Sequence, residues 1–373
     1  MASTCNQLLD LCLRGQPWSP ELLDRAIAED DGRALFSIVV ERLGDLFEPG
    51  LCDTYARLFS QVIARVCPEL IPRTRRITSR TGLWPDTNRV YVLSRITLGA
   101  DVAVTSVLLD KAKRRYPSAE IVFAGPRKNY ELFEADARIL HRDVPYARGG
   151  SLRDRLEASA ALWFDDGLVL DPDSRLTQLG LIRVCRDDRY RFFESRSFGG
   201  NGNERLPDLA ARWADDPKAR PYVATRPASG PAADITVSLG VGENHAKRLD
   251  DDFERELMRL LAATGASVLI DKGGSAAERE RVERAIPSGV RTHEGSFAPF
   301  AAEIARSKLF VGYDSAAGHV ASACGVSLIS IAKGFVNERM AARWRPIGTV
   351  LDGSAPNALD QVRKALATCT FRR

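Results

Sequence analysis

The sequence is short of several features that mark particular protein classes. No apolar run approaches the roughly 20 residues of a membrane-spanning helix. The first residues lack the basic start and apolar core of a signal peptide. The seven cysteines form no Cys-x-x-Cys pair, so neither a zinc knuckle nor a disulfide framework is indicated. The net charge of +4 is too small to favour a nucleic-acid partner. Together these absences predict a cytoplasmic protein.

The chain is long enough for more than one core. Its 373 residues, 45% hydrophobic and 27% charged, are typical of a soluble globular protein of two or more domains. Composition and the positions of proline and glycine divide the chain into three parts. They are a helical N-terminal region over residues 1–82, a first α/β domain over 83–228 and a second over 229–373. Helices are expected at Leu22–Ala28, Ala34–Phe47 and Cys52–Val66.

Residues 235–331 alternate between short apolar runs and segments with apolar residues three and four apart. This alternation predicts a parallel sheet covered on both faces by helices. The expected strands are Ile235–Leu239, Ser267–Asp271, Val290–His293, Leu309–Val311 and Ser327–Ile331. The expected helices are Asp252–Ala263, Ala276–Ala285, Phe297–Ala305 and Ser315–Ala323.

A second strand–helix–strand pattern precedes this one. Arg89–Ser94 and Glu120–Ala124 are expected strands, and Val102–Tyr116 is the expected helix between them. The last turns of this helix are basic, and the helix dipole favours positive charge at that end. The chain is therefore predicted to fold into two Rossmann-like domains.

Glycines and polar residues follow three expected strands of the second domain. They lie in the segments Gly240–Lys247, Asp271–Ser275 and Asp314–His319. Ligands of parallel sheets bind beyond the carboxyl ends of the strands, and a helix start offers free N–H groups to phosphate. A phosphate-bearing ligand is the functional interpretation, and an ordinary capped strand–helix corner is the alternative.

The stretch Arg73–Arg80 is strongly basic. It is interpreted as a solvated linker between the helical region and the first strand. The alternative is a contact with an anionic membrane surface, where each Lys or Arg contributes ~1 kcal/mol. That alternative would place the protein peripherally at the inner face of the plasma membrane.

Two motifs resemble glycosyltransferase family 9, the ADP-heptose:lipopolysaccharide heptosyltransferases. They are Leu98-Gly99-Ala100-Asp101 and Asp314-Ser315-Ala316-Ala317-Gly318-His319. The flanking segments Leu109–Pro117 and Ala302–Gly312 also fit the family pattern, and the resemblance covers roughly residues 89–370. It implies the GT-B architecture, in which two Rossmann-like domains face each other across a cleft. The N-terminal helices lie outside it as an extension.

The resemblance also implies roles for individual residues. Asp101 would be the general base, with capping of the following helix as its structural alternative. The donor would be held by Gly240, Asn244, Lys247, Gly273, Glu278, Asp314, Ser315, Ala316, Gly318 and His319. The acceptor would be held by Arg95, Gly99 and Arg127. The chain departs from the family pattern at Ala100, which is inserted between the glycine and the aspartate, and at Ala316, which replaces a glycine.

The implied reaction is an inverting transfer of a heptose-like sugar from a nucleoside-diphosphate donor to a hydroxyl group. An ADP-linked donor is favoured, and the acceptor would be a glycan, a lipid-linked molecule or a protein. No cofactor or metal is expected, because no Asp-x-Asp pair sits at a suitable strand end. Asp171-Pro172-Asp173 has that pattern, but it is interpreted as a turn of the first domain. Two alternatives stay open. One is a nucleotide-sugar epimerase, and the other is a non-catalytic GT-B protein that binds a protein partner through its N-terminal helices. The sequence names neither the sugar, the base nor the acceptor.

Overall fold

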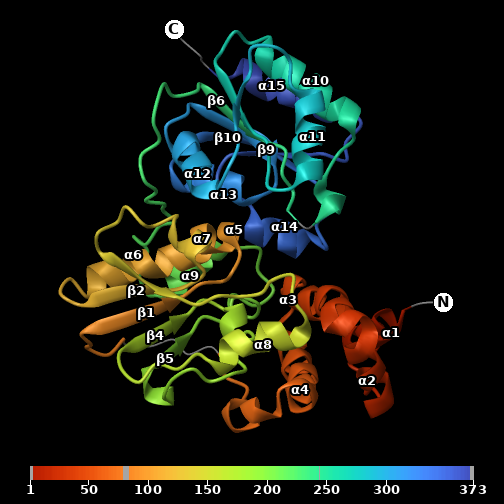
Figure 1. Cartoon of the computed structure of the whole chain (residues 1–373), viewed down its shortest axis with the longest axis vertical. Coiled ribbons are helices and arrows are strands. Elements are labelled where there is room, and N and C mark those ends of the chain that lie inside the picture. Colours follow the sequence, from red (N-terminus) through yellow and green to blue (C-terminus); the bar gives the residue numbers. More distant parts are fainter. Residues whose placement is uncertain (1–2, 79–83, 243, 370–373) are drawn as a thin grey trace.

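The computed structural model describes residues 3–78, 84–242 and 244–369. It contains two parallel sheets stacked along the long axis of the molecule (Figure 1). The first has the order β3-β2-β1-β4-β5, with bounds Ile139–Asp143, Glu120–Gly125, Arg89–Leu93, Leu168–Asp171 and Tyr190–Phe192. The second has the order β11-β10-β9-β6-β7-β8, with bounds Thr349–Asp352, Ser327–Ala332, Leu309–Tyr313, Ile235–Ser238, Val268–Asp271 and Arg291–His293.

Helices cover both faces of the second sheet. Along β9, Leu309, Val311 and Tyr313 pack on one side, while Phe310 packs on the other. The first side is covered by α10 (Asp251–Ala262), α11 (Ala276–Ala285) and α15 (Ala358–Ala367), and the second by α12 (Phe297–Ala305) and α13 (Ala316–Ala323). The predicted alternation of strands and helices is confirmed. The sequence reading missed α14 (Glu338–Trp344), β11 and α15.

In the first domain, β1 runs into α5 (Leu98–Ala100), a π-helical turn (Asp101–Thr105) and then α6 (Ser106–Arg115). The remaining helices of this domain are α7 (Arg127–Tyr130), α8 (Leu152–Ala160) and α9 (Leu206–Trp213). Parallel pairing of β1 with both β2 and β4 confirms a second Rossmann-like unit. The architecture is therefore GT-B-like, as the sequence predicts.

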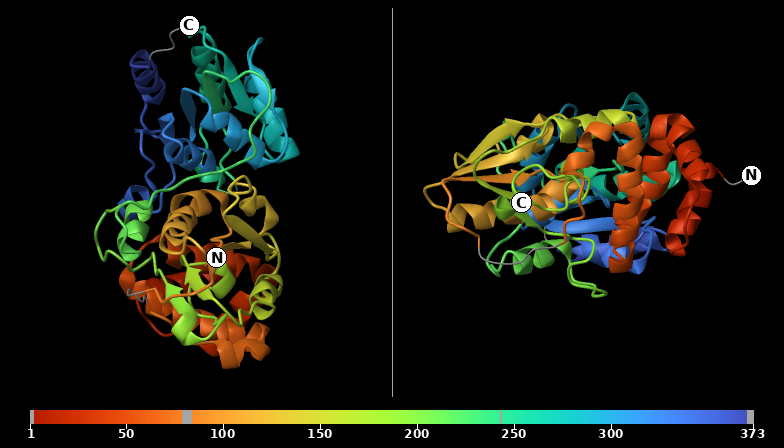
Figure 2. Two further views of the ribbon diagram at one scale, coloured as in Figure 1. Left: turned by 90° about the vertical axis from the view of Figure 1, so that its left-hand side faces the viewer. Right: turned by 90° about the horizontal axis from the view of Figure 1, so that it is seen from below.

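The N-terminal region is helical, as predicted, but it has no separate core. Its helices are α1 (Thr4–Leu13), α2 (Pro20–Ala28), a π-helical segment (Leu35–Val40), α3 (Glu41–Asp45) and α4 (Pro49–Val66). Their apolar faces share one cluster with first-domain side chains, namely Leu152, Leu156, Leu179, Leu181 and Ile182. Both views in Figure 2 show these helices, in red and orange, against the first domain. Within the described residues, no helix is long and apolar enough to cross a membrane.

The described part of the basic stretch is fixed to the first domain. The Arg73 guanidinium donates over 2.6–3.0 Å to four backbone carbonyls, those of Ser159, Ala160, Leu162 and Arg183. Arg76 pairs with the buried carboxylate of Glu194. The interpretation of this stretch as a solvated linker is wrong for both arginines, because their charges are used inside the fold. Residues 79–80 lie outside the described residues.

Candidate active site

The ends of β6 and β7 bring three predicted donor residues together. The Glu278 carboxylate accepts from the Gly274 N–H at 3.0 Å and lies between Gly240 and Gly273. A Cβ added at Gly240 would come within 2.9 Å of Glu278 Oε1, and one added at Gly273 within 2.2 Å of its carboxyl carbon. Gly273 also has a φ of +86°. Only glycine suits this close approach and this backbone conformation.

An ion pair joins the ends of β6 and β9. Lys247 follows β6 in a short 3₁₀ turn, and its Nζ lies 2.5 Å from Asp314 Oδ2 and 3.3 Å from the Asp314 carbonyl oxygen. The next residue, Ser315, is the N-cap of α13, yet its buried Oγ has no hydrogen-bond partner among the described residues. A cation, an unused hydroxyl and a helix N-terminus thus converge at one strand end, which suits an anionic ligand.

The two domains meet at the first turns of α13. A Cβ added at Gly99 would lie 3.1 Å from His319 Cδ2 and 3.2 Å from Ala316 Cα. The Trp344 ring lies 5.8 Å from the His319 ring and 5.7 Å from the Arg95 guanidinium. Burial lowers the pKa of His319, and the nearby Lys247 lowers it further against the opposing effect of Asp314. The imidazole is therefore neutral at neutral pH and can donate a hydrogen bond without carrying charge.

Two predicted donor residues have local roles. Asn244 is exposed, and its Oδ1 accepts from the Ala246 N–H at 3.1 Å, which shapes the turn that carries Lys247. Gly318 is buried in α13, but a Cβ there would make only an ordinary contact, 3.9 Å from Leu328.

The Asp101 carboxylate lies inside the first domain. It is fully buried and accepts four hydrogen bonds over 2.6–2.7 Å, from Ser94 Oγ, the Arg95 N–H, Thr105 Oγ1 and Asn129 Nδ2. Burial raises its pKa, while these hydrogen bonds lower it. A general base must reach the proton that it takes. In this conformation the carboxylate is covered, and it ties the end of β1 to the helix that follows.

Arg127 lies apart from the other predicted acceptor residues. It pairs with Glu134 and lines a cavity of about 440 Å³ that also contains His293 and Arg226 of the interdomain connection. Neither Arg95 nor Gly99 contributes to that lining. Arg95 instead donates to Ser195 Oγ at 3.0 Å and reaches Trp344 of the second domain.

The sequence reading missed a carboxylate from the N-terminal region. Asp45, the last residue of α3, is half-buried, and burial raises its pKa to about 6. Arg175, Lys247 and Arg95 lower that pKa electrostatically, so cations of both domains act on Asp45. Nothing local marks this residue, because acidic side chains near helix ends are common in solvated positions.

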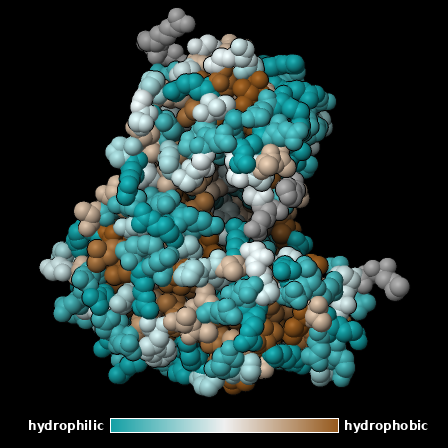
Figure 3. Space-filling view, in the orientation of Figure 1, coloured by the Kyte–Doolittle hydropathy of each residue, from teal (hydrophilic) through white to brown (hydrophobic). Residues whose placement is uncertain are grey.

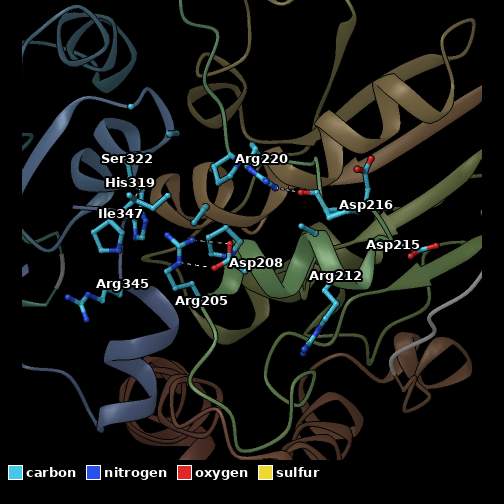
Figure 4. Close-up of a pocket in the computed structure, with 18 residues that line it drawn as sticks. Arg205, Asp208, Arg212, Asp215, Asp216, Arg220, His319, Ser322, Arg345 and Ile347 are labelled. Atoms are coloured by element: carbon cyan, nitrogen blue, oxygen red, sulfur yellow. Dashed lines mark hydrogen bonds and ion pairs between the residues drawn. The ribbon is translucent and has the colours of Figure 1, made fainter. Parts of the chain in front are cut away.

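The surface is hollowed between the two domains (Figure 3). A cavity of about 690 Å³ lies between α9 and α13, with His319 and Ser322 on one side and Arg205 and Asp208 on the other (Figure 4). Its lining includes neither Lys247 nor any other residue of the β6 and β9 ends. The cavity and the strand ends therefore share only the neighbourhood of His319.

Comparison with known proteins agrees with this architecture. Residues 188–349 match the model of glycosyltransferase family 9 (heptosyltransferase). The E. coli heptosyltransferase WaaC with ADP has a TM-score of 0.54 at 17% identity, over 76% of this chain and 100% of that chain. E. coli ADP-heptose lps heptosyltransferase II has a TM-score of 0.53 at 18% identity, over 75% and 98%. A family 9 glycosyltransferase from Veillonella parvula has 0.53 at 13% identity, over 77% and 93%.

No curated protein matches the sequence. At these identities the structural likeness establishes the fold, which is GT-B-like. The match to the family 9 model, over residues 188–349, makes this part of the chain similar to heptosyltransferases, and the helical N-terminal region lies outside that match.

Proposed function

We propose that this protein is an inverting, metal-independent glycosyltransferase. It moves a heptose-like sugar from a nucleoside diphosphate to a hydroxyl of a glycan, lipid-linked or protein acceptor. The observation that carries the proposal is the convergence of Lys247, Asp314 and the unused Ser315 hydroxyl at the start of α13, opposite Gly99 of the first domain. An ADP-linked donor is favoured, since WaaC has been solved with ADP and with ADP-2-deoxy-2-fluoro heptose.

In the proposed reaction, the acceptor oxygen attacks the anomeric carbon from the face opposite the diphosphate. The bond from that carbon to the phosphate oxygen breaks, and the diphosphate leaves with the electron pair. Lys247 and the N–H groups at the start of α13 stabilise its charge, while Ser315 and His319 donate hydrogen bonds. Glu278, between Gly240 and Gly273, accepts from the nucleoside ribose. Arg95 and Gly99 border the acceptor.

Nucleotide binding tests the donor site. We expect ADP to raise the melting temperature, since a ligand at a hundred times its dissociation constant stabilises by ~2.7 kcal/mol. GDP, UDP and dTDP in parallel samples identify the base. Lys247→Ala and His319→Ala variants that remain folded should bind the preferred nucleotide at least ~10-fold more weakly, as each loses a charged or hydrogen-bonding contact. Parental affinity in both variants would show that the site is misplaced.

Metal independence is tested with a chelator. Among the described residues, no group of three or more His, Cys, Asp or Glu side chains is arranged to hold a metal ion. Lys247 and the start of α13 are proposed to supply the positive charge instead. We expect release of nucleoside diphosphate from the donor to continue unchanged in excess EDTA. Loss of turnover that Mg²⁺ or Mn²⁺ restores would contradict this part of the proposal.

One observation favours a second candidate, a non-catalytic GT-B protein. The carboxylate that the family resemblance marks as the base, Asp101, is fully covered. Such a protein would bind the nucleotide sugar but release no nucleoside diphosphate with any acceptor. Measured turnover therefore decides between the two candidates.

A further inference from the structure

The N-terminal region contacts the second domain directly after α3. Asn337 Nδ2 donates to the Leu46 carbonyl at 3.1 Å, and Arg339 Nη1 donates to the Phe47 carbonyl at 3.0 Å. Phe47 is buried, with its ring 6.3 Å from the Trp344 ring. Figure 1 shows α3 next to α14 at the level where the two domains meet. This extension therefore forms part of the wall between the two domains.

Asp45 precedes this contact by one residue, and charged groups of both domains act on its carboxylate. The backbone of Gly44 lies so close to Arg175 that an added Cβ would be 3.4 Å from Nη2. The groups that face Asp45 electrostatically are Arg175 after β4, Lys247 after β6, Arg95 after β1 and Glu41 on α3 itself. Three of these four are cations, and they come from the strand ends of both sheets.

The other carboxylates near the site are occupied. Asp101 accepts four hydrogen bonds, Asp314 is paired with Lys247, and Glu278 holds the Gly274 N–H. The Asp45 carboxylate has no hydrogen bond and no ion pair within 4 Å in the part of the chain that the structure describes. Among these four carboxylates it is thus the one whose oxygen atoms are available to a ligand.

We propose that Asp45, supplied by the N-terminal extension, is the carboxylate that accepts the proton of the acceptor hydroxyl. This assignment rests on the proposed glycosyl transfer. As the acceptor oxygen bonds to the anomeric carbon, its proton passes to Asp45, while the electron pair of the broken bond leaves on the diphosphate. The proton is later released to solvent. The extension is then part of the catalytic machinery as well as a structural addition.

The ionisation of Asp45 suits this role. Its pKa of about 6 leaves the carboxylate ionised at neutral pH and makes it a stronger base than an ordinary aspartate. Below that pKa the residue is protonated and cannot take a proton. The catalytic efficiency, kcat/KM, should therefore rise with pH through about 6 and then level off.

The test compares Asp45→Asn with the parent full-length chain. ADP-heptose serves as the donor probe, and ADP release is measured in buffer alone, where water is the acceptor, and with added glycan or lipid-linked acceptors. We expect kcat to fall by ~10²–10⁴-fold, the acid limb of the pH profile near 6 to disappear, and ADP affinity to stay within about twofold of the parent, since Asp45 touches the acceptor. Glu48→Gln, which removes an exposed carboxylate three residues away, is the matched control and should change none of these quantities.

The possible outcomes separate this assignment from the proposed function. Parental turnover and an unchanged pH profile in Asp45→Asn would overturn the role of Asp45 and leave the transferase intact. Equal losses in Asp45→Asn and Glu48→Gln would also overturn it, because any change of charge in the segment would then suffice. A parent chain that binds ADP but releases none from ADP-heptose or other nucleotide sugars would overturn both the transferase function and the role of Asp45.

Discussion

At the scale of single residues, Asp101 shows that a residue can match a family motif and still have the surroundings of a structural residue. Its position after β1 matches the family pattern, and its environment is that of a structural carboxylate. Four donors from the end of β1, the π-helical turn and α7 all point at it. Removing such a group affects every partner, because a buried donor left unpaired costs about 1–3 kcal/mol.

Asp101→Asn should therefore lower the free energy of unfolding by about 1–3 kcal/mol, since an amide has one accepting oxygen where the carboxylate has two. Urea unfolding measures this, with the exposed Asp165→Asn as control. The sign of the pH dependence follows from the raised pKa. The folded protein keeps this proton when the unfolded chain has lost it, so Asp101 contributes less stability as the pH rises above about 4. The Asp101→Asn variant should not show this loss of stability with rising pH. An Asp101→Asn protein of parental stability and strongly reduced turnover would instead support the base role that the resemblance implies.

At the scale of elements, the helix after β1 is irregular directly after Ala100, the residue at which the motif departs from the family pattern. The helix after β1 contains a π-helical turn over Asp101–Thr105 and becomes an ordinary α-helix from Ser106 onward. One additional residue in a helical turn rotates the residues before it by about 100° relative to those after it. The π-helical turn therefore sets the direction of the Asp101 side chain relative to α6.

At the scale of the whole molecule, the N-terminal extension joins the two domains. Phe47 lies at the junction, with the Arg343 guanidinium 5.6 Å from its ring and Trp344 in edge contact. Arg343 in turn donates to the carbonyls of Phe198 and Gly200 in the first domain. The arrangement fixes α3, and with it Asp45, relative to both sheets.

Phe47→Ala should lower the free energy of unfolding by about 3–5 kcal/mol, as other buried Phe→Ala changes do, and should also reduce turnover because Asp45 loses its fixed position. Phe59→Ala is the matched control, because Phe59 is equally buried within the N-terminal core and stacks on Tyr55. It should cost similar stability and leave the turnover of the folded fraction unchanged. Equal kinetic losses in both variants would mean that general destabilisation, rather than the junction, affects activity.

Much of the architecture was determined by local sequence. Apolar periodicity predicted β1, β2 and the helix between them in the first domain, and five of the six strands of the second sheet. The helices α11 and α12 agree with their predicted bounds, because short-range patterns reflect which face of an element is buried. The glycine-containing turns after β6 and β7 were also readable, since close approach and positive φ require glycine. The surroundings of the Asp101, Arg73 and Asp45 side chains were decided only by the tertiary structure. Each depends on partners distant in the chain, such as Asn129 for Asp101, Arg183 for Arg73 and Lys247 for Asp45. Whether a charged side chain is solvated, buried or directed into a cleft is set by those partners, and no local pattern encodes them.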